Sequence, residues 1–241
     1  MMIRRMTEKD FSRFVDSLPE CERIPRDRGK HREGRQQADY FFRHKGIIAE
    51  LKCFDEDMTS KLQLLADMLM KQRNLVLLGS MSFNGIFRSQ PDYPKLVLEA
   101  IKKADSALVR AFTKANSQIQ HTKEDNTLPD SLGLLILFNN ENKALDPGLS
   151  NLALRYCLQQ HCADGRPKYG SIDACIYRSC VAAGRRANQI TYAWQTLFLP
   201  GKCDSVAQGY IKRLVEWCDR FDWEEGIPWE GQDRLDDPSW V

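Results

Sequence analysis

The 241-residue sequence has no apolar run near the length of about 20 residues that a membrane-spanning helix needs. Its longest apolar stretches, such as 75–78 and 132–138, have the length of a strand or a core helix. The basic N-terminus, Met1 to Arg5, is not followed by the apolar core of a signal peptide. We therefore expect a cytoplasmic protein without a membrane partner, folded as a single domain over residues 1–241.

Nothing indicates a disulfide framework, because a chain without a secretion signal is expected to keep its eight cysteines as free thiols. The pairs Cys157/Cys162 and Cys175/Cys180, with His161 nearby, raise the alternative of a zinc-stabilised interaction module. The second pair falls in an expected strand, where a separation of five residues places two side chains on opposite faces. We therefore favour buried thiols.

A strong excess of one charge is also missing, since the net charge is only +2. The charges are nevertheless unevenly distributed, with a basic segment at 23–35 and an acidic, tryptophan-containing tail from Asp219 onward. A solvated loop would have the same composition as the basic segment. Five of its residues are our candidates for phosphate contacts that hold a nucleic acid without reading its sequence: Arg26, Arg28, Lys30, Arg32 and Arg35.

Hydrophobic periodicity predicts alternating helices and strands. The expected helices cover 7–18, 57–72, 94–123, 147–160 and 205–220. The expected strands cover 38–42, 47–54, 132–138, 171–179 and 189–199. Residues 20–37 are expected to form a loop, and Gly46 suits a positive φ angle in the turn between the first two strands. This order predicts an α/β fold with a mixed central sheet flanked by helices.

One expected strand carries charge where core strands rarely do. Glu50 and Lys52 interrupt the apolar run 47–54, and alternate residues of a strand face the same side. The hairpin brings Asp39 across the ladder to Glu50. A plain ion pair at an exposed strand edge would contribute only about 0–1 kcal/mol, which is a poor reason to interrupt a core strand.

Two carboxylates beside an ammonium group suit the cleavage of a phosphodiester. Mg²⁺ prefers carboxylate oxygens and keeps several waters, and the carbonyl of Leu51 could supply a further ligand. The ion neutralises a phosphate oxygen and lowers the pKa of a bound water. Lys52 can orient that water or stabilise charge in the transition state.

Ala38-Asp39-Tyr40, the hairpin and Ile48-Ala49-Glu50-Leu51-Lys52 resemble the core of the PD-(D/E)xK nuclease superfamily, which has a restriction-endonuclease-like fold. The resemblance covers about sixteen residues, and Ala38 stands where proline is usual. It implies that Asp39 and Glu50 bind Mg²⁺, with Mn²⁺ able to substitute, and that Lys52 is catalytic. Residues 55–93 would be a helical insertion.

The same resemblance suggests further site residues. Members often add an acidic residue from the first helix, for which Glu20 is the candidate and Glu8 and Asp16 are alternatives. They also add a glutamine or lysine from a later helix, for which Gln118 is the candidate and Gln63 the alternative. The resemblance implies hydrolysis of nucleic acid, expected to be DNA, in a defence or restriction-type role and with a partner subunit or as a homodimer.

Two alternatives remain open at this point. The chain could be a non-catalytic nucleic-acid-binding or scaffold protein on the same fold, which should lack a carboxylate-dependent metal site. Asp173, inside another apolar stretch, could be a further acidic site residue, although a hydrogen bond from the end of its strand to a loop is favoured.

Overall fold

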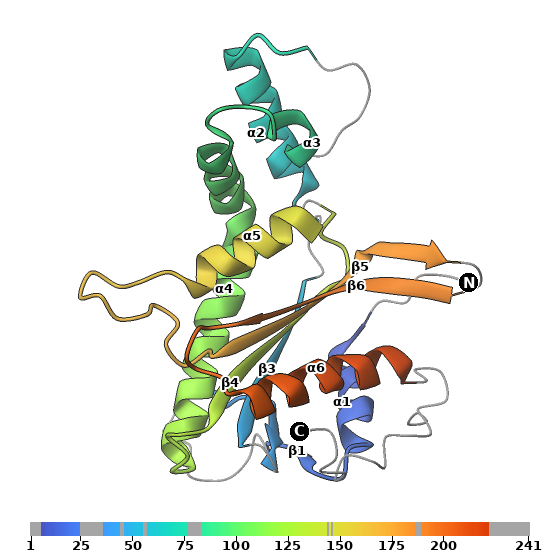
Figure 1. Ribbon diagram of the computed structural model, residues 1–241, viewed down its shortest axis with the longest axis vertical. Helices are drawn as coiled ribbons and strands as arrows, with labels where there is room; N and C mark the ends of the chain where they lie inside the picture. The colour runs from blue at the N-terminus through green and yellow to red at the C-terminus, as the bar shows by residue number, and fades with distance from the viewer. Residues whose placement is uncertain are drawn as a thin grey trace.

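The computed structural model describes residues 6–24, 36–43, 46–54, 57–76, 83–143, 145, 147–186 and 189–221. Within these residues helices and strands alternate along the chain (Figure 1). The helices are α1 (Glu8–Asp16), α2 (Thr59–Gln72), α3 (Phe83–Phe87), α4 (Tyr93–Asp125), α5 (Pro147–Leu158) and α6 (Ser205–Arg220). The strands are β1 (Cys21–Arg23), β2 (Tyr40–Phe42), β3 (Ile47–Phe54), β4 (Leu132–Asn139), β5 (Ala174–Arg186) and β6 (Gln189–Phe198).

The six strands form one mixed sheet in the order in which they follow along the chain, β1 to β6. β3, β4 and β5 run parallel to one another, while the β1–β2, β2–β3 and β5–β6 pairs are antiparallel. The prediction of an α/β fold with a mixed sheet flanked by helices is confirmed. Gly46 has a φ of +56°, as expected for the turn before β3.

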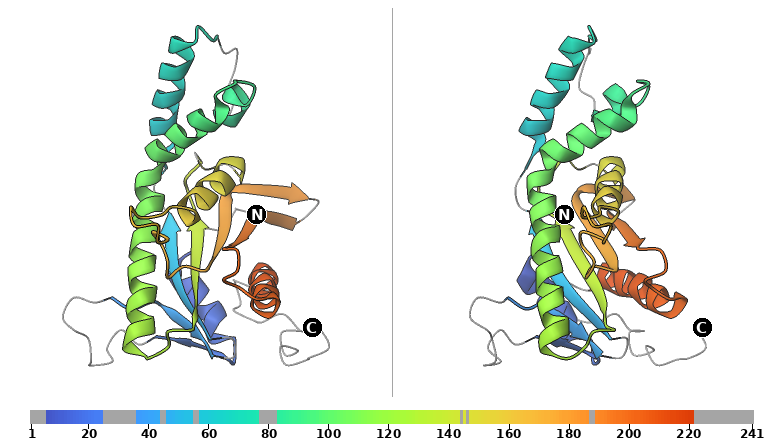
Figure 2. Two further views of the ribbon diagram at one scale, coloured as in Figure 1. Left: turned by 60° about the vertical axis from the view of Figure 1, so that its left-hand side comes forward. Right: turned by 90° about the vertical axis from the view of Figure 1, so that its left-hand side faces the viewer.

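Helices cover both faces of the sheet (Figure 2). α2, α4 and α5 contribute to one apolar cluster, which includes Ile48 and Phe54 of β3. α1 and α6 contribute to the other, which includes Ile47, Ala49 and Leu51 of the same strand. The alternation along β3 therefore distributes its side chains between two apolar layers, as the period of two in a strand requires.

The central strands are placed by close contacts at their amino ends. A side chain at Gly133, the second residue of β4, would place its Cβ 1.8 Å from the carbonyl oxygen of Ser171 and 3.0 Å from Ile119 of α4. The missing side chain thus lets the loop before β5 and the helix α4 approach β4 together. The 33 residues of α4 rise about 1.5 Å each, which gives the helix a length of roughly 50 Å.

Beyond the carboxyl end of β3, α2 and α3 pack against the amino-terminal part of α4 and extend away from the sheet (Figure 1). Helical structure was expected in this region, and α2 agrees closely with the predicted helix 57–72. None of the helices in the described part of the chain is long and apolar enough to cross a bilayer.

Two strands differ from the predictions. β1 lies in the segment 20–37 that was expected to be a loop, and it is only three residues long. β5 continues to Arg186, well past the predicted end at residue 179. Both differences arise where a strand is held by its neighbour, β2 or β6, and not by an apolar pattern of its own.

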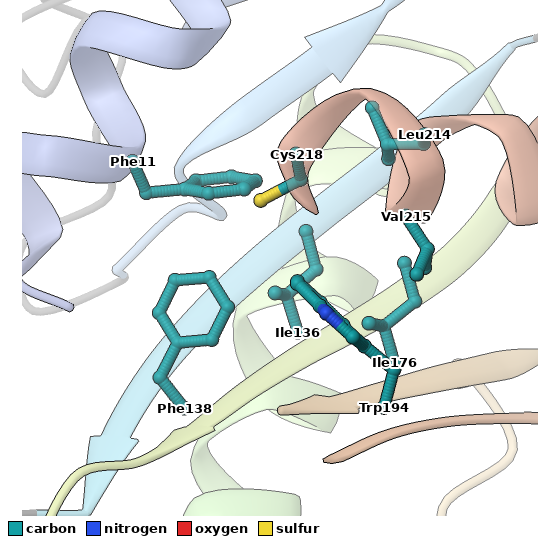
Figure 3. A pocket seen from close by; sticks show the side chains of 8 residues that line it. All are labelled: Phe11, Ile136, Phe138, Ile176, Trp194, Leu214, Val215 and Cys218. Atoms are coloured by element: carbon teal, nitrogen blue, oxygen red, sulfur yellow. The ribbon is translucent and has the colours of Figure 1, made fainter. Parts of the chain in front are cut away.

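The layer between the sheet and α6 contains a small apolar cavity of about 10 Å³ (Figure 3). Side chains of five elements line it, among them Phe11 of α1, Trp194 of β6 and Cys218 of α6. A space of this size is near the minimum for one water molecule, so it is a packing defect of the core and not a ligand site.

Candidate active site

Glu50 and Lys52 lie on the same side of β3, in the layer that α4 covers. Their neighbours on this side, Ile48 and Phe54, belong to the apolar cluster. Glu50 is 1% exposed. The ammonium group of Lys52 donates a hydrogen bond to Glu50 Oε1 and forms an ion pair with it. The charged pair therefore interrupts a buried apolar surface, as the sequence predicted.

Asp39 reaches this strand from the residue immediately before β2. The register of the β2–β3 pair places it beside Glu50. Its backbone N–H donates to the Ala49 carbonyl at 3.2 Å, and its Oδ2 accepts from the Leu51 N–H at 3.0 Å. Since the N–H and C=O of one strand residue point to the same edge, the Leu51 carbonyl faces the side of the strand where Asp39 lies.

Gln118 of α4 joins Lys52 to the chain segment that precedes Asp39. Its side-chain Oε1 accepts a hydrogen bond from Lys52 Nζ at 3.0 Å. Its Nε2 donates to the carbonyl of Gln37 at 3.1 Å. Both ends of the amide are thus engaged, which fixes its orientation and holds the Lys52 ammonium group in one place.

The same face of α4 holds residues 36–38. Thr122, four residues after Gln118, is 1% exposed and accepts a hydrogen bond from the Ala38 N–H at 2.8 Å. Its hydroxyl donates in turn to the Gln118 carbonyl at 2.8 Å. Two further residues of this face bond to the segment, His121 to Gln36 and Asp125 to Gln37. The helix thereby fixes the backbone that leads into Asp39.

The environment of Glu50 disfavours its charged form. The pKa of Glu50 is raised to about 8, mainly by burial and next by the neighbouring charge of Asp39, whereas Lys52 lowers the pKa. A hydrogen bond between the two carboxyl groups, possible when one is protonated, raises the pKa further. Within the described residues, Glu50 Oε2 is buried and accepts no hydrogen bond. A positive charge between the two acids would oppose this rise in pKa.

A divalent cation fits these residues. The described part of the chain holds no group of three or more His, Cys, Asp or Glu side chains arranged for a metal ion. Mg²⁺ does not require one, since it keeps several waters and is commonly held by one or two carboxylates together with substrate phosphates. Asp39, Glu50 and the Leu51 carbonyl supply that smaller set, and the unsatisfied Glu50 Oε2 gives the ion a vacant acceptor.

Comparisons of the chain with protein-family models, with curated proteins and with solved structures gave no significant match. The functional assignment therefore depends on the geometry of the site itself.

The structure does not bring Glu20 to the site, which corrects the prediction that it is a metal ligand. Glu20 lies just before β1, where its carbonyl accepts from the Arg43 N–H at 3.0 Å. Asp39 lies at the other end of the β1–β2 pair, where its carbonyl accepts from the Ile24 N–H at 2.8 Å. The four residues from 20 to 24 span about 13 Å in an extended chain, which is too far for a shared ion.

The alternatives to Glu20 have different surroundings. Asp16 pairs with Arg23 on the surface. Glu8 lines a polar cleft of about 320 Å³ together with Lys52. Cys53 of β3 and Asn140, which follows β4, line the same cleft. Glu8 is therefore the acid of the first helix that shares a cleft with the candidate lysine.

Two other predicted site residues have simple outcomes. Gln63, the alternative to Gln118, bonds to Asp67 on the exposed side of α2 and is not at the site. Asp173 accepts hydrogen bonds from the Gly133 N–H at 2.8 Å and from Lys123 Nζ at 3.3 Å. This is a structural bond at the start of the parallel strands. The sequence favoured a structural bond as well, but to a loop and not to β4 and α4.

The predicted phosphate contacts lie outside the described residues: Arg26, Arg28, Lys30, Arg32 and Arg35. The described residues on either side of that segment are both close to the site. Ile24 bonds to Asp39, and Gln36 lies beside His121 of α4. The basic segment is thus joined to the rest of the chain at two points next to the candidate site.

All eight cysteines are among the described residues and are free thiols, which confirms that prediction. Cys157 of α5 and Cys175 of β5 are buried, and Cys162 is exposed. Cys175 belongs to the apolar cluster beneath α5, whereas Cys180 bonds to Asn140. Burial raises the pKa of Cys180. The thiols of the two predicted pairs are therefore divided among different environments.

Proposed function

We propose that the chain is a Mg²⁺-dependent nuclease with a restriction-endonuclease-like core, in which Asp39, Glu50 and the Leu51 carbonyl hold the ion. The observation that carries the proposal is the buried Glu50 carboxylate, which interacts with both Asp39 and Lys52 and has an oxygen that accepts no hydrogen bond from the described residues. Mn²⁺ is expected to substitute, because it prefers the same oxygen ligands.

The bound ion supplies a Lewis acid that neutralises charge on the phosphate and makes a water more acidic. The protein supplies the position of each group. Lys52 places a positive charge next to the two acids, where it can orient the attacking water and stabilise charge that develops on the phosphate. Gln118 holds that ammonium group, and Thr122 holds the backbone before Asp39.

The proposed substrate is nucleic acid, with DNA preferred. The described residues that flank 25–35 lie next to the candidate site. The composition of the basic segment suits the binding of phosphates without reading bases. The same proposal includes a defence or restriction-type role, and action as a homodimer or with a partner subunit. It also includes a cytoplasmic location, which the eight free thiols favour.

The test is cleavage of plasmid and single-stranded DNA by the wild type and by Lys52→Ala in Mg²⁺, Mn²⁺ or EDTA. We expect metal-dependent cutting by the wild type and a loss of about 10²–10³-fold in the variant, the usual cost of removing one charge-stabilising donor. Lys123→Ala is the matched control, because Lys123 also pairs with a buried carboxylate, Asp173.

Lys123→Ala should cut at the rate of the wild type. Cleavage by Lys52→Ala at the wild-type rate would contradict the assignment of the site. Absence of cutting by every form, together with no carboxylate-dependent binding of Mn²⁺, would favour a non-catalytic protein on this fold.

A further inference from the structure

β5 and β6 continue beyond the rest of the sheet as a two-stranded ribbon (Figures 1 and 2). β4 accompanies β5 only as far as the pair of Asn139 with Ser179. From there to Arg186, β6 is the one strand in the described part of the chain that pairs with β5. These seven residues can span at most about 23 Å at 3.3 Å per residue.

An irregular register redirects this ribbon. The regular pairing of β5 with β6 stops at Ser179 and resumes at Gly184, which pairs with Thr191. Four residues of β5 therefore lie opposite a single residue of β6, because Ser179 itself pairs with Ala193. Bulges of this kind bend a strand and increase its twist. The outer part of the ribbon thus leaves the sheet in a new direction, away from α4 (Figure 1).

The ribbon is free of negative charge in its sequence. No Asp or Glu occurs between Asp173 and Asp204, although acids make up 33 of the 241 residues. Arg185 and Arg186 are the last two residues of β5, at the outer end of the ribbon. A projecting basic end without acids of its own suits a polyanionic partner.

The ribbon leaves the sheet at the carboxyl ends of the parallel strands, which is also the end of β3 where Lys52 lies. β3, β4 and β5 are parallel, and Lys52 is level with Leu137 and Tyr177. The ribbon therefore begins two residues beyond the level of Lys52. Two strand spacings, about 10 Å, separate β3 from β5. A nucleic acid with a phosphate at Lys52 is thus long enough to contact the ribbon as well.

We propose that this ribbon is a duplex-binding arm: its end, with Arg185 and Arg186, enters a groove of double-stranded nucleic acid. The major groove of B-form DNA is about 12 Å wide and admits a two-stranded ribbon. Single strands present no groove, so the substrate of the site is double-stranded. The inference rests on the proposed nuclease function for its substrate, but the binding step can be measured without cleavage.

The experiment measures binding of a fluorescein-labelled 25-base-pair duplex, and of one of its strands, by fluorescence anisotropy in EDTA at several salt concentrations. The test variant is Arg185→Gln/Arg186→Gln. The matched control, Lys202→Gln/Lys212→Gln, removes the same charge beyond the opposite end of the β5–β6 pair and on the exposed side of α6. Thermal unfolding of each variant verifies that the fold is intact.

For the test variant we expect the duplex Kd to rise at least about tenfold, and the slope of log K against log salt to fall by roughly 1.8, which is two phosphate contacts. The control variant should bind as the wild type does, and binding of the single strand should change much less. Arg185→Lys/Arg186→Lys should keep most of the salt dependence, because it keeps the charge.

An unchanged duplex Kd and salt slope in the test variant would overturn the proposal, and so would an equal loss for the single strand. Since EDTA prevents metal-dependent cutting, these results are separate from those for the nuclease. If the wild type cuts DNA and the test variant binds the duplex as tightly as the wild type, the arm alone is refuted. If the test variant loses duplex binding but the wild type never cuts DNA, the nuclease alone is refuted.

Discussion

Two buried carboxylates of the central sheet, Glu50 and Asp173, each pair with a lysine, yet their surroundings differ. Asp173 lies just before β5, where a single oxygen accepts both the Gly133 N–H and Lys123. Glu50 lies within β3, where Lys52 bonds to one oxygen and the other accepts no hydrogen bond from the described residues. Burial and an ion pair are therefore common to a structural acid and a candidate ligand.

The two acids differ in whether their charge is balanced by hydrogen bonds and neighbouring groups. A backbone N–H satisfies Asp173, so the bond links the starts of β4 and β5 and requires nothing more. Glu50 has a second acid, Asp39, as its neighbour, and the pKa of Glu50 rises to about 8 as a result of burial and this charge. A divalent cation, as we propose for this site, would satisfy the oxygen that lacks a hydrogen bond and reduce the repulsion between the two acids.

Substitution of Glu50 should give the largest effect. Glu50→Gln keeps the shape of the side chain but removes one of two metal-binding charges. We expect cleavage of plasmid DNA to fall by about 10³-fold or more, because the several kcal/mol supplied by the ion are lost. Asp173→Asn should cut as the wild type does at a temperature where both are folded. Equal losses in both variants would contradict the assignment of Glu50 as a metal ligand and of Asp173 as a structural acid.

A smaller effect is expected from Thr122, which acts on Asp39 only through the backbone. Thr122→Val keeps the shape but leaves the buried Ala38 N–H without its acceptor. We expect the affinity for Mn²⁺ to fall by about 10–100-fold, as for other residues that orient a ligand. Thr122→Ser restores the hydroxyl and should restore most of the affinity, which a general loss of packing would not allow. Isothermal titration calorimetry measures both, and equal Mn²⁺ affinity in Thr122→Val and the wild type would contradict this role.

The pH dependence of stability tests the same comparison in the absence of metal. The pKa of Glu50 is raised from 4.5 to about 8 in the folded, metal-free protein. Between these values the folded state binds a proton that the unfolded state has released, so stability falls as pH rises. The contribution changes by at most about 1.4 kcal/mol per pH unit and levels off above pH 8.

Urea unfolding in EDTA from pH 5 to pH 8 measures this slope. Glu50→Gln should be less dependent on pH than the wild type, whereas Asp173→Asn should retain the wild-type slope. A wild-type slope that survives in Glu50→Gln would place the titrating group elsewhere.

The sequence predicted the core of the site because its signal is local. Glu50 and Lys52 interrupt an apolar strand, and Gly46 with its positive φ marks the turn that brings Asp39 beside it. The predicted strand 47–54 is β3, and the predicted helix 205–220 is α6. Gln118 was proposed from the family resemblance, on an expected helix, and its bond to Lys52 spans 66 positions of the chain.

Tertiary structure decided the residues that the sequence misplaced or missed. Glu20 follows the first helix, as the resemblance required, but the pairing of β1 with β2 places it at the wrong end of the hairpin. Thr122 gives no signal in sequence, since a threonine on a helix face is common. The outer part of β5 has neither large apolar residues nor alternation around Ala182, so only its pairing with β6 defines it.

The most direct test of the central claim is a Mn²⁺ titration of the wild type, Glu50→Gln and Asp173→Asn, followed by electron paramagnetic resonance of the free ion. We predict metal binding at the Asp39–Glu50 site in the wild type and in Asp173→Asn, and its loss in Glu50→Gln. Equal binding by all three proteins, or a loss confined to Asp173→Asn, would contradict the assignment of Glu50 as a metal ligand.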